Sequence, residues 1–458
     1  MAAPITKLRI GLKPDTPEEH TRLLIDVNTE EAQTSLQITT DLRVRANPAT
    51  AKIYYYNFDG SELLYTETIE PGGNGSWDGE PGRAGGEGYA WIFKGWAAEP
   101  NASEPTEGVL DGIFSARRVY AAYLRRDTTG FVAFDGISTL KTANGLKNWD
   151  GKLFWSIDAA TWTEWHGEEI AAGVDSKIYL RGTGNRLITG NPVNQKNFVI
   201  TGGDSGVKCD GNIEFLLDFE ATLAGEPPSM RPGCFCALFY NCAQLISAPR
   251  LPARTITTFC YYSMFEGCSA LKSAPELPAT IMYDSCYSYM FRGCSALESA
   301  PELPATSLAS HCYSGMFLGT GLKSAPKLPA TIMMDSCYSG MFSTCTALKS
   351  APELPATILA ESCYDGMFRS CRALESVPDL PATTLPYRAY RSMFNGCTGI
   401  KIAAAASETF SKPFRIPAAG EGTADATALG DMFVNTGGTF KGTPAINTTY
   451  YLAPPAST

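Results

Sequence analysis

Histidine and basic charge are both scarce in this chain of 458 residues. Three histidines are present, and 37 Lys and Arg stand against 47 Asp and Glu, so the formal net charge is −10. His20, His166 and His311 fall in three different parts of the chain, which argues against a Ser-His-Asp or Cys-His catalytic site. The sequence also lacks a phosphate-binding loop and a dinucleotide fingerprint. We therefore expect a protein that is not an enzyme and uses no cofactor.

Long apolar runs and basic stripes are missing too. No stretch of about 18 or more apolar residues occurs, so the sequence predicts no membrane-spanning helix and no membrane insertion. The acidic balance argues against nucleic acid as a partner. Residues 1–9 lack the apolar core of a secretion signal.

Cysteine is confined to the region between Cys209 and Cys397, where it follows a repeat. Twelve of the 14 cysteines occupy two columns, in which neighbouring copies are 26, 26, 26, 25, 26 and 26 residues apart. The first column consists of Cys234, Cys260, Cys286, Cys312, Cys337, Cys363 and Ala389. The second consists of Cys242, Cys268, Cys294, Thr320, Cys345, Cys371 and Cys397. A fixed period of this length predicts stacked copies that bury a continuous core, that is, a solenoid.

The column cysteines are expected to be reduced and buried side by side, because free cysteine is among the most buried residue types. Disulfides and a metal site are the two alternatives. Thr320 and Ala389 replace a cysteine without breaking the repeat, which argues against obligatory disulfides. The spacing between the two columns is not that of a zinc site, and His311 is the one histidine in the array, so we expect no metal.

Each copy divides into two halves. In the first half, Cys286, Met290 and Cys294 recur at intervals of four residues, which predicts one or two turns of helix. The second half carries two prolines, which cannot donate to a sheet, so we expect a short strand at 271–274 followed by an extended ridge. Carboxylates recur on this ridge at Glu276, Glu302, Glu353 and Asp379. Because Arg250 and Lys327 occupy the same column, we interpret it as a solvated face.

This repeat resembles the BspA-like leucine-rich repeats of bacterial and phage surface proteins. The resemblance rests on Met264-Phe265-x-x-Cys268-x-x-Leu271 and its later equivalents, and on the tail segments Asp431 to Phe440 and Gly442 to Tyr451. It covers 229–458 and implies an α/β leucine-rich-repeat-like solenoid of about seven 26-residue repeats at 229–400. A C-terminal cap is expected at 401–458, since the last copy must cover its apolar face.

The first segment, residues 1–46, has apolar runs of strand length at 7–12, 21–27 and 35–44. Thr16 and Pro17 are also compatible with the start of a short helix. Three short strands make a poor independent core. We therefore expect an attachment or oligomerisation segment that sister chains or a larger assembly complete. The alternative is a small β-domain packed on the next one.

Residues 47–126 contain a predicted hairpin, formed by 52–57 and 63–69 around a turn at Asp59 and Gly60. This unit resembles the Listeria–Bacteroides repeat, a small β-grasp-like module of extracellular proteins. The matching residues are the Asp-Gly turn, the segment Phe93-Lys-Gly-Trp96 and the closing Val119-Tyr-Ala-Ala-Tyr123. The glycine-rich stretch at 71–88 is longer than the resemblance leads us to expect.

Residues 127–228 are predicted to form a further β-domain, with strand-like segments at 131–134, 153–157, 177–182 and 197–201. It resembles the domain that often precedes such arrays, and 212–219 looks like the N-terminal cap of the solenoid. Four tryptophans gather in this unit: Trp149, Trp155, Trp162 and Trp165. Alternation in strands predicts that at least half of them point into the core, and an exposed sugar-binding platform is the alternative.

The copies differ at a few columns while the core columns stay constant. The residue after Met-Phe is Glu266, Arg292, Leu318, Ser343, Arg369 or Asn395. The second residue after the first column is Tyr262, Ser288, Ser314, Ser339, Asp365 or Arg391. Varied exposed side chains on a regular frame suit a recognition surface, and the alternative is variation on a surface without a function. Since Tyr and Arg dominate interface hot spots, the candidate ligand contacts are Tyr262, Tyr283, Tyr289, Arg292, Arg369 and Arg388.

These features predict a modular, non-enzymatic virion protein of a phage, a tail or head fibre or a capsid decoration. A surface-protein repeat without a secretion signal is expected to leave the cell by lysis as part of a virion, and a mature chain whose signal has been removed is the competing explanation. Residues 1–46 are expected to bind other virion proteins, in several copies or as a homo-oligomer. The solenoid is expected to bind a protein or glycan of the host cell surface. The alternatives are a purely structural decoration or spacer of a capsid or tail, and an adhesin on a bacterial cell surface.

Overall fold

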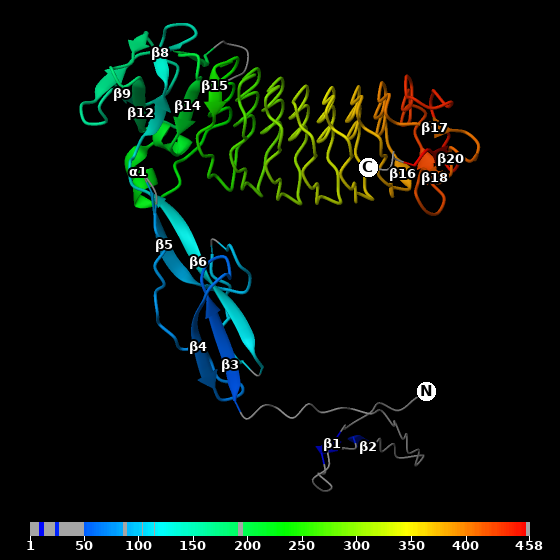
Figure 1. Cartoon of the computed structure of the whole chain (residues 1–458), viewed down its shortest axis with the longest axis horizontal. Helices are drawn as coiled ribbons and strands as arrows, with labels where there is room; N and C mark the ends of the chain where they lie inside the picture. Colours follow the sequence, from blue (N-terminus) through cyan, green and yellow to red (C-terminus); the bar gives the residue numbers. More distant parts are fainter. Residues whose placement is uncertain are drawn as a thin grey trace, which may run out of the picture. The chain divides into compact units, whose positions relative to one another are not determined.

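The computed structural model describes residues 9–12, 23–26, 50–85, 89–102, 104–113, 115–190 and 196–454. It is mainly β, with almost no helix (Figure 1). Two compact units divide between Arg126 and Asp127. At the start of the chain, β1 (Arg9–Leu12) and β2 (Leu23–Asp26) pair antiparallel, where the sequence predicts two strands. The strand predicted at 35–44 and the alternative helix start at Thr16 lie outside the described residues.

The main sheet of the first unit has four strands in the order β4-β3-β6-β5. They are β3 (Ala51–Tyr56), β4 (Leu63–Ile69), β5 (Tyr89–Ala97) and β6 (Arg117–Asp127). The predicted hairpin is confirmed, because β3 and β4 pair antiparallel across the Asp59-Gly60 turn. The two central strands, β3 and β6, are parallel. Gly60 has φ +77°, and a Cβ there would lie 2.9 Å from the Tyr120 ring, so the turn requires glycine.

Aromatic side chains fill the core of the first unit. The ring of Tyr55 lies 4.9 Å from that of Trp77 and 4.8 Å from that of Trp96, both edge to face. The Tyr55 hydroxyl donates to the Glu67 carboxylate (2.5 Å), which also accepts from the Ser76 hydroxyl. Ser76 and Trp77 belong to the glycine-rich stretch, so this insertion contributes to the core of the unit.

The second unit begins with a β-domain of two sheets. The larger sheet has the order β10-β9-β12-β7-β14-β15 and the smaller one the order β11-β8-β13. The strands are β7 (Val132–Asp135), β8 (Ile137–Thr142), β9 (Lys152–Ser156), β10 (Thr163–Trp165), β11 (Ile170–Ala171), β12 (Lys177–Thr183), β13 (Phe198–Gly202), β14 (Val207–Asp210) and β15 (Leu245–Ser247). The four strands predicted from the sequence correspond to β7, β9, β12 and β13 and are confirmed within one residue at each end.

Two of the four tryptophans of this domain lie in its core. Trp149 and Trp165 are buried, with stacked rings 5.1 Å apart. Trp155 and Trp162 are half-buried, and Trp162 lies on the Arg181 guanidinium, 4.0 Å from the ring centre. The prediction that at least half of these rings point inward is therefore confirmed.

A short helical segment joins the β-domain to the repeat array. It consists of the 3-10 helix η1 (Ile213–Leu216), capped by the Asn212 side chain, and of α1 (Phe219–Ala224), capped by Asp218. Ile213 and Phe215 are fully buried in a core shared with the array. The N–H of Ile213 donates to the carbonyl of Arg250 in the first copy (3.1 Å), so this segment covers the first face of the array.

The repeat array, residues 229–400, is a row of similar turns whose first copy carries β15 (Figure 1). In 259–267, every second backbone N–H donates to a backbone carbonyl of the next copy, 25 residues later in the sequence. The donor and acceptor pairs are Phe259 and Asp284, Tyr261 and Cys286, Ser263 and Ser288, Phe265 and Met290, and Gly267 and Arg292. The residues between them donate within their own copy, as Tyr262 does to the carbonyl of Phe259 (3.3 Å). Backbone hydrogen bonds therefore both close the turns and join neighbouring copies.

The helical turns predicted for the first half of each copy are wrong. Phe259, Ser263 and Gly267 have φ values of 56°, 50° and 76°, and positive values recur every fourth residue in later copies. A positive φ does not occur in a right-handed helix. An apolar residue at every fourth position fits a helix, but it fits a chain of four-residue turns equally well. Among the described residues, helix is confined to η1 and α1.

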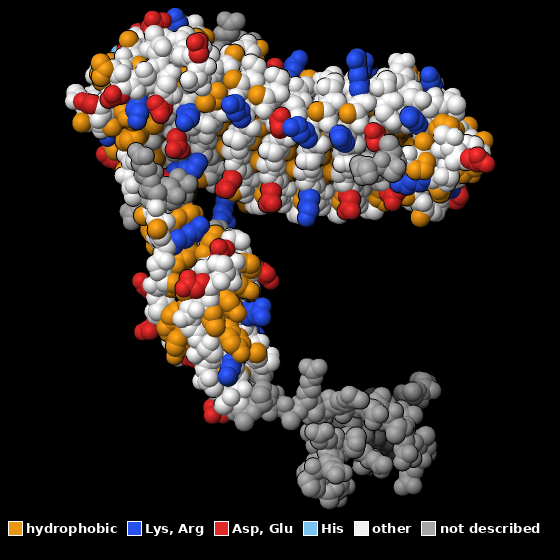
Figure 2. Space-filling model, viewed as in Figure 1, with side chains coloured by type: hydrophobic (Ala, Val, Ile, Leu, Met, Phe, Trp, Pro, Cys, Tyr) orange, Lys and Arg blue, Asp and Glu red, His pale blue; other side chains and the backbone are white. Residues whose placement is uncertain are grey.

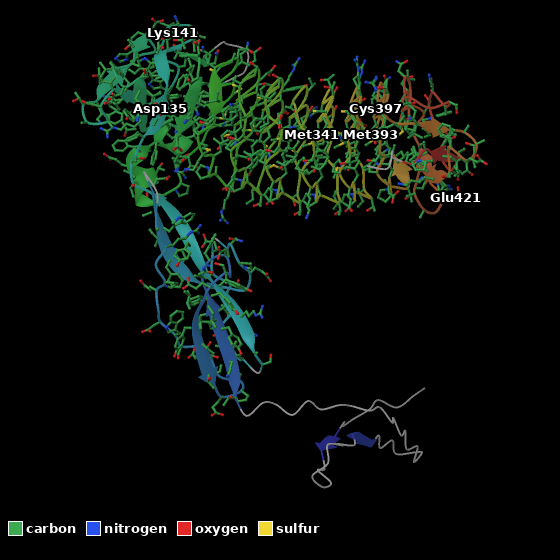
Figure 3. All side chains as sticks on the ribbon, in the orientation of Figure 1. Asp135, Lys141, Met341, Met393, Cys397 and Glu421 are labelled. Carbon is green, nitrogen blue, oxygen red and sulfur yellow. The ribbon has the colours of Figure 1, made fainter. Side chains whose placement is uncertain are left out.

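Buried side chains in the array form columns that run from copy to copy. The rings of Tyr287 and Tyr313 lie 5.7 Å apart at an interplanar angle of 1°, and those of Phe291 and Phe317 lie 5.7 Å apart at 4°. Such offset stacks contribute about 0.5–1.5 kcal/mol per pair beyond the buried area. Figure 3 shows Met341, Met393 and Cys397 inside the turns, where all three are fully buried.

All 14 cysteines are free and buried, in agreement with the expected reduced columns. The thiol of Cys294 donates to the carbonyl of Phe265 in the preceding copy (3.1 Å), and the thiol of Cys397 does the same to Phe368 (2.9 Å). Burial raises the pKa of Cys294 and of Cys397 to about 12, so these thiols stay protonated and unreactive at neutral pH. Within the described residues, no group of three or more His, Cys, Asp or Glu side chains is placed to hold a metal ion.

The second half of each copy is extended but forms little sheet. The strand predicted at 271–274 is wrong. Among the equivalent described segments, pairing occurs in the first copy, where β15 is parallel to β14, and in the last copy, where Ile402 and Ala403 pair antiparallel with Leu452 and Tyr451. The solvated ridge is confirmed for the later copies, where Glu276, Glu302, Lys327, Glu353 and Asp379 are exposed. Arg250 differs, because it is half-buried and forms an ion pair with Asp127.

The end of the array is covered by two small sheets. In one, β16 (Thr384–Leu385) pairs in parallel with β19 (Thr423–Ala424). In the other, of order β17-β20-β18, the strands are β17 (Ile402–Ala403), β18 (Lys412–Arg415) and β20 (Thr449–Leu452). The Phe433 ring continues the phenylalanine column 5.6 Å from Phe394, and Phe414 meets it edge to face. These residues close the apolar end of the core.

Candidate functional site

In the first copies of the array, positions 2, 3 and 6 after the first-column residue line a common pocket, and we call the side of the turns that carries these positions the turn face. Its side chains change from copy to copy while the columns beneath it stay constant. Part of it is less exposed than the sequence predicts, since Ser288 and Ser314 are buried. The reason is that their hydroxyls donate to backbone carbonyls, as Ser314 does to Ser339 of the next copy (3.3 Å).

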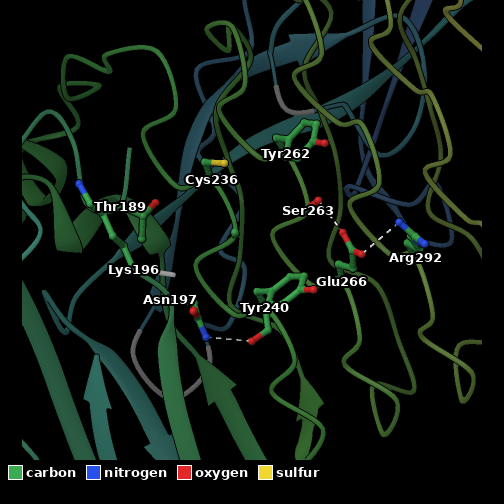
Figure 4. A pocket seen from close by; sticks show the side chains of 10 residues that line it. Thr189, Lys196, Asn197, Cys236, Tyr240, Tyr262, Ser263, Glu266 and Arg292 are labelled. Carbon is green, nitrogen blue, oxygen red and sulfur yellow. Dashed lines mark hydrogen bonds and ion pairs between the residues drawn. The ribbon is translucent and has the colours of Figure 1, made fainter. Parts of the chain in front are cut away.

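A pocket of about 340 Å³ opens where the turn face meets the β-domain (Figure 4). The β-domain contributes Thr189, Lys196 and Asn197 to one side. The first copies of the array contribute Cys236, Ala237, Tyr240, Tyr262, Ser263, Glu266 and Arg292 to the other. The pocket is therefore built from a unique loop and from several neighbouring copies.

Glu266 is the charged centre of this pocket. Its carboxylate accepts from the Ser263 hydroxyl (2.6 Å) and lies 3.4 Å from the Arg292 guanidinium of the next copy. The Glu266 side chain is 17% exposed and that of Arg292 is 49% exposed, so the carboxylate is held in place while the guanidinium reaches solvent. Across the pocket, the Asn197 side-chain amide donates to the carbonyl of Tyr240 (3.0 Å).

Tyrosine rings form the aromatic wall of the pocket. Tyr240 is 37% exposed, and Tyr262 is half-buried with its ring edge to face with Tyr289 of the next copy (5.8 Å). The Tyr289 ring lies over the backbone of Gly315, where a Cβ would come within 2.4 Å of it, and Arg292 lies 5.6 Å from the ring centre. The Tyr289 ring therefore packs against both the Tyr262 ring and the Arg292 guanidinium.

The pocket offers hydrogen bonding rather than nucleophilic chemistry. Burial raises the pKa of Cys236 to about 12, so its thiol is not ionised at neutral pH. Burial also raises the pKa of Tyr262, whose hydroxyl consequently remains a donor. The polar groups of this site are thus a fixed carboxylate, a guanidinium, the Lys196 ammonium, an amide and neutral hydroxyls.

The structure brings together three of the six residues predicted as ligand contacts. Tyr262 and Arg292 line the pocket, and Tyr289 contacts both of them. Arg369 is exposed on the turn face three copies further on, in the same column as Arg292. Tyr283 is 52% exposed in a different segment, close in sequence to the exposed Ile281. Arg388 lies over the ring of its neighbour Tyr387, 4.6 Å from its centre, and is half-buried.

Sequence comparison between copies missed several residues of the pocket. Tyr240 precedes Glu266 and Arg292 by one and two periods, so the same comparison extended to the first copy would have found it. Glu266 occupies a variable position, but the preference for tyrosine and arginine at interface hot spots does not select it. Lys196 and Asn197 come from a loop that is not repeated, and no sequence signal indicates that it approaches the array.

Two further hollows lie between neighbouring proline-rich ridges. Each has a volume of about 330–340 Å³, one at Ala274 to Pro304 and the other at Ala351 to Pro381. Apolar side chains, mostly prolines, form most of their walls, with one carboxylate from each ridge. They repeat with the array, and their linings differ little between copies, as where Asp379 takes the place of Glu302, so we do not assign them a ligand.

Comparison with known proteins gave no match to any family model, curated protein or solved structure. Within the described part of the chain, neither helical segment is long and apolar enough to cross a membrane. Figure 2 shows single charged side chains scattered over the visible face of the array, separated by uncharged surface. The array and its pocket are therefore the features of this chain that indicate a function.

Proposed function

We propose that the protein is a non-enzymatic virion protein of a phage, a tail or head fibre or a capsid decoration. Residues 1–46 attach it to other virion proteins, in several copies or as a homo-oligomer. The array presents the turn face to a protein or glycan of the host cell surface. The place of action is accordingly the surface of the extracellular particle.

One observation carries this proposal: a constant frame presents side chains that change from copy to copy. The Tyr and Phe columns keep ring spacings of 5.5–5.9 Å through the array. Above them, position 6 of the turn face passes from Tyr240 and Glu266 to Arg292 and Arg369. A rigid scaffold that positions varied side chains in this way costs little entropy on binding.

The architecture that we propose for the array is a leucine-rich-repeat-like solenoid of about seven 26-residue repeats, similar to BspA-like repeats. The hydrogen bonds and ring stacks between consecutive copies support it. For 47–126 we propose a Listeria–Bacteroides-like, β-grasp-like module, supported by the order β4-β3-β6-β5 with parallel central strands.

Particles that carry residues 1–228 in place of the full chain are the first test. They are expected to retain the protein, because attachment is assigned to 1–46, but to adsorb to host cells at least about tenfold less, as loss of a hot-spot cluster implies. The measurement is the rate at which free particles disappear from a host suspension, with protein content checked by mass spectrometry. Normal adsorption by these particles would instead identify a structural decoration or spacer.

A further inference from the structure

The pocket lies where the repeat departs from its own pattern. In the column of Tyr289 the next three copies carry Gly315, Gly340 and Gly366. In the column of Tyr262 the next three carry Ser288, Ser314 and Ser339. The frame thus accepts glycine and serine at these positions, and the two tyrosine rings are additions that the fold does not require.

The added rings contact each other and lie beside the charged pair of the site. Tyr262 lines the pocket and meets Tyr289 edge to face, and Arg292 extends from Tyr289 to Glu266. Half-exposed tyrosine offers a flat apolar face together with a hydroxyl, and it loses little entropy when it binds. The site therefore combines stacking surface with fixed hydrogen-bonding groups over a short distance.

The polar groups match a ligand that carries several hydroxyls and no charge. The Glu266 carboxylate retains acceptor capacity beyond Ser263 and Arg292, and the guanidinium has donors left beyond Glu266. Glu266 and Arg292 offset each other, and the third charged group of the lining, Lys196, points its Nζ away from them (Figure 4), so the pair favours neutral donors and acceptors over an anion. The volume of about 340 Å³ is at the lower end of ligand pockets, which span roughly 300–1,000 Å³, and suits a small ring.

We propose that this pocket binds an uncharged pyranose of a host-surface glycan. A pyranose presents a face of C–H groups that stacks on an aromatic ring, and an edge of hydroxyls that both donate and accept. The C–H face stacks on the rings of Tyr262 and Tyr240. The hydroxyls form hydrogen bonds with the side chains of Glu266, Arg292 and Asn197. This assignment rests on the proposed function and specifies the chemistry of the ligand.

The test uses the full chain and the methyl glycosides of glucose, galactose, mannose and N-acetylglucosamine. Saturation-transfer NMR is expected to show binding of at least one of them, strongest at ring protons. The double variant Tyr262→Ser and Tyr289→Gly takes residues from neighbouring copies, so the fold is kept. Its affinity is expected to fall at least about tenfold, and that of Glu266→Gln by a similar factor.

The matched control is Glu298→Gln. Glu298 forms an exposed ion pair with Lys323 of the next copy, outside the pocket, so this variant is expected to bind as the unchanged chain does. Melting temperatures of all variants verify that they fold. Absence of binding to all four glycosides, or binding that the double variant retains, would overturn the assignment.

The outcome separates this assignment from the proposed function. If particles without the array fail to adsorb but no glycoside binds, the array recognises another kind of receptor and the pyranose assignment fails alone. If glycosides bind at the pocket but particles without the array adsorb normally, the recognition role on the virion fails and the pyranose site stands.

Discussion

Deletion of half a copy, residues 286–298, is expected to unfold the array, whereas deletion of the whole copy, 286–311, is expected to leave a folded and shorter protein. Each copy contacts its neighbours, so a complete unit can be removed without changing the remaining contacts. After the whole deletion, the N–H of Tyr261 meets the carbonyl of Cys312 in place of that of Cys286. After the half deletion, the second half of the copy, 299–311, remains without its first half. The turns on either side of it are then no longer one period apart, and they cannot align.

Thermal unfolding followed by circular dichroism distinguishes the two deletions. The whole-copy variant is expected to unfold cooperatively near the melting temperature of the full chain. The half-copy variant is expected to show no cooperative transition of the array. Equal damage from both deletions would show that the copies are not interchangeable units, and the proposed solenoid would have to be abandoned.

Replacement of Phe317 by alanine is expected to lower the free energy of unfolding by about 3–5 kcal/mol, the usual cost of removing a buried phenylalanine. The side chain is fully buried, and its ring lies between those of Phe291 and Phe342, at 5.7 and 5.8 Å. The change opens a cavity in the column and breaks two stacks. Urea unfolding measures it, provided that the transition is two-state.

The matched control for this substitution is the adjacent Leu318→Ser. Leu318 is half-buried on the turn face, and Ser343 occupies the same column in the next copy. We expect a loss below about 1 kcal/mol, since surface changes usually have small effects. If both variants lost the same free energy, the ring column would not be the main source of stability in the array.

The repeat and its buried columns could be predicted because they depend on period alone. Residues such as Cys286 and Met290 recur at a fixed interval, and any stacked arrangement of copies buries them. The local conformation could not be predicted in the same way. Helices and four-residue turns both place every fourth residue on one side, and the decisive positive φ falls on residues such as Ser263 and Tyr289, which no turn rule assigns to it.

The site was predicted in part for a related reason. Comparison of copies identifies Tyr262, Tyr289 and Arg292 because each differs from its equivalents. The same comparison cannot rank Arg369 against Arg292, since both vary in one column. What separates them is the β-domain loop at Asn197, which meets the first copies and makes a pocket there. A tertiary contact between a loop that is not repeated and a repeat does not change the spacing of the repeat, so the sequence period does not reveal it.

The most direct test of the recognition role is competition by the second unit alone, residues 127–458, which forms one compact body. Host cells are incubated with the purified unit, and the adsorption rate of particles is then measured against its concentration. The unit is expected to slow adsorption, and its Tyr262→Ser, Tyr289→Gly variant is expected to require at least about tenfold more protein for the same effect. Adsorption that stays unchanged at saturating concentrations of the folded unit would contradict the account.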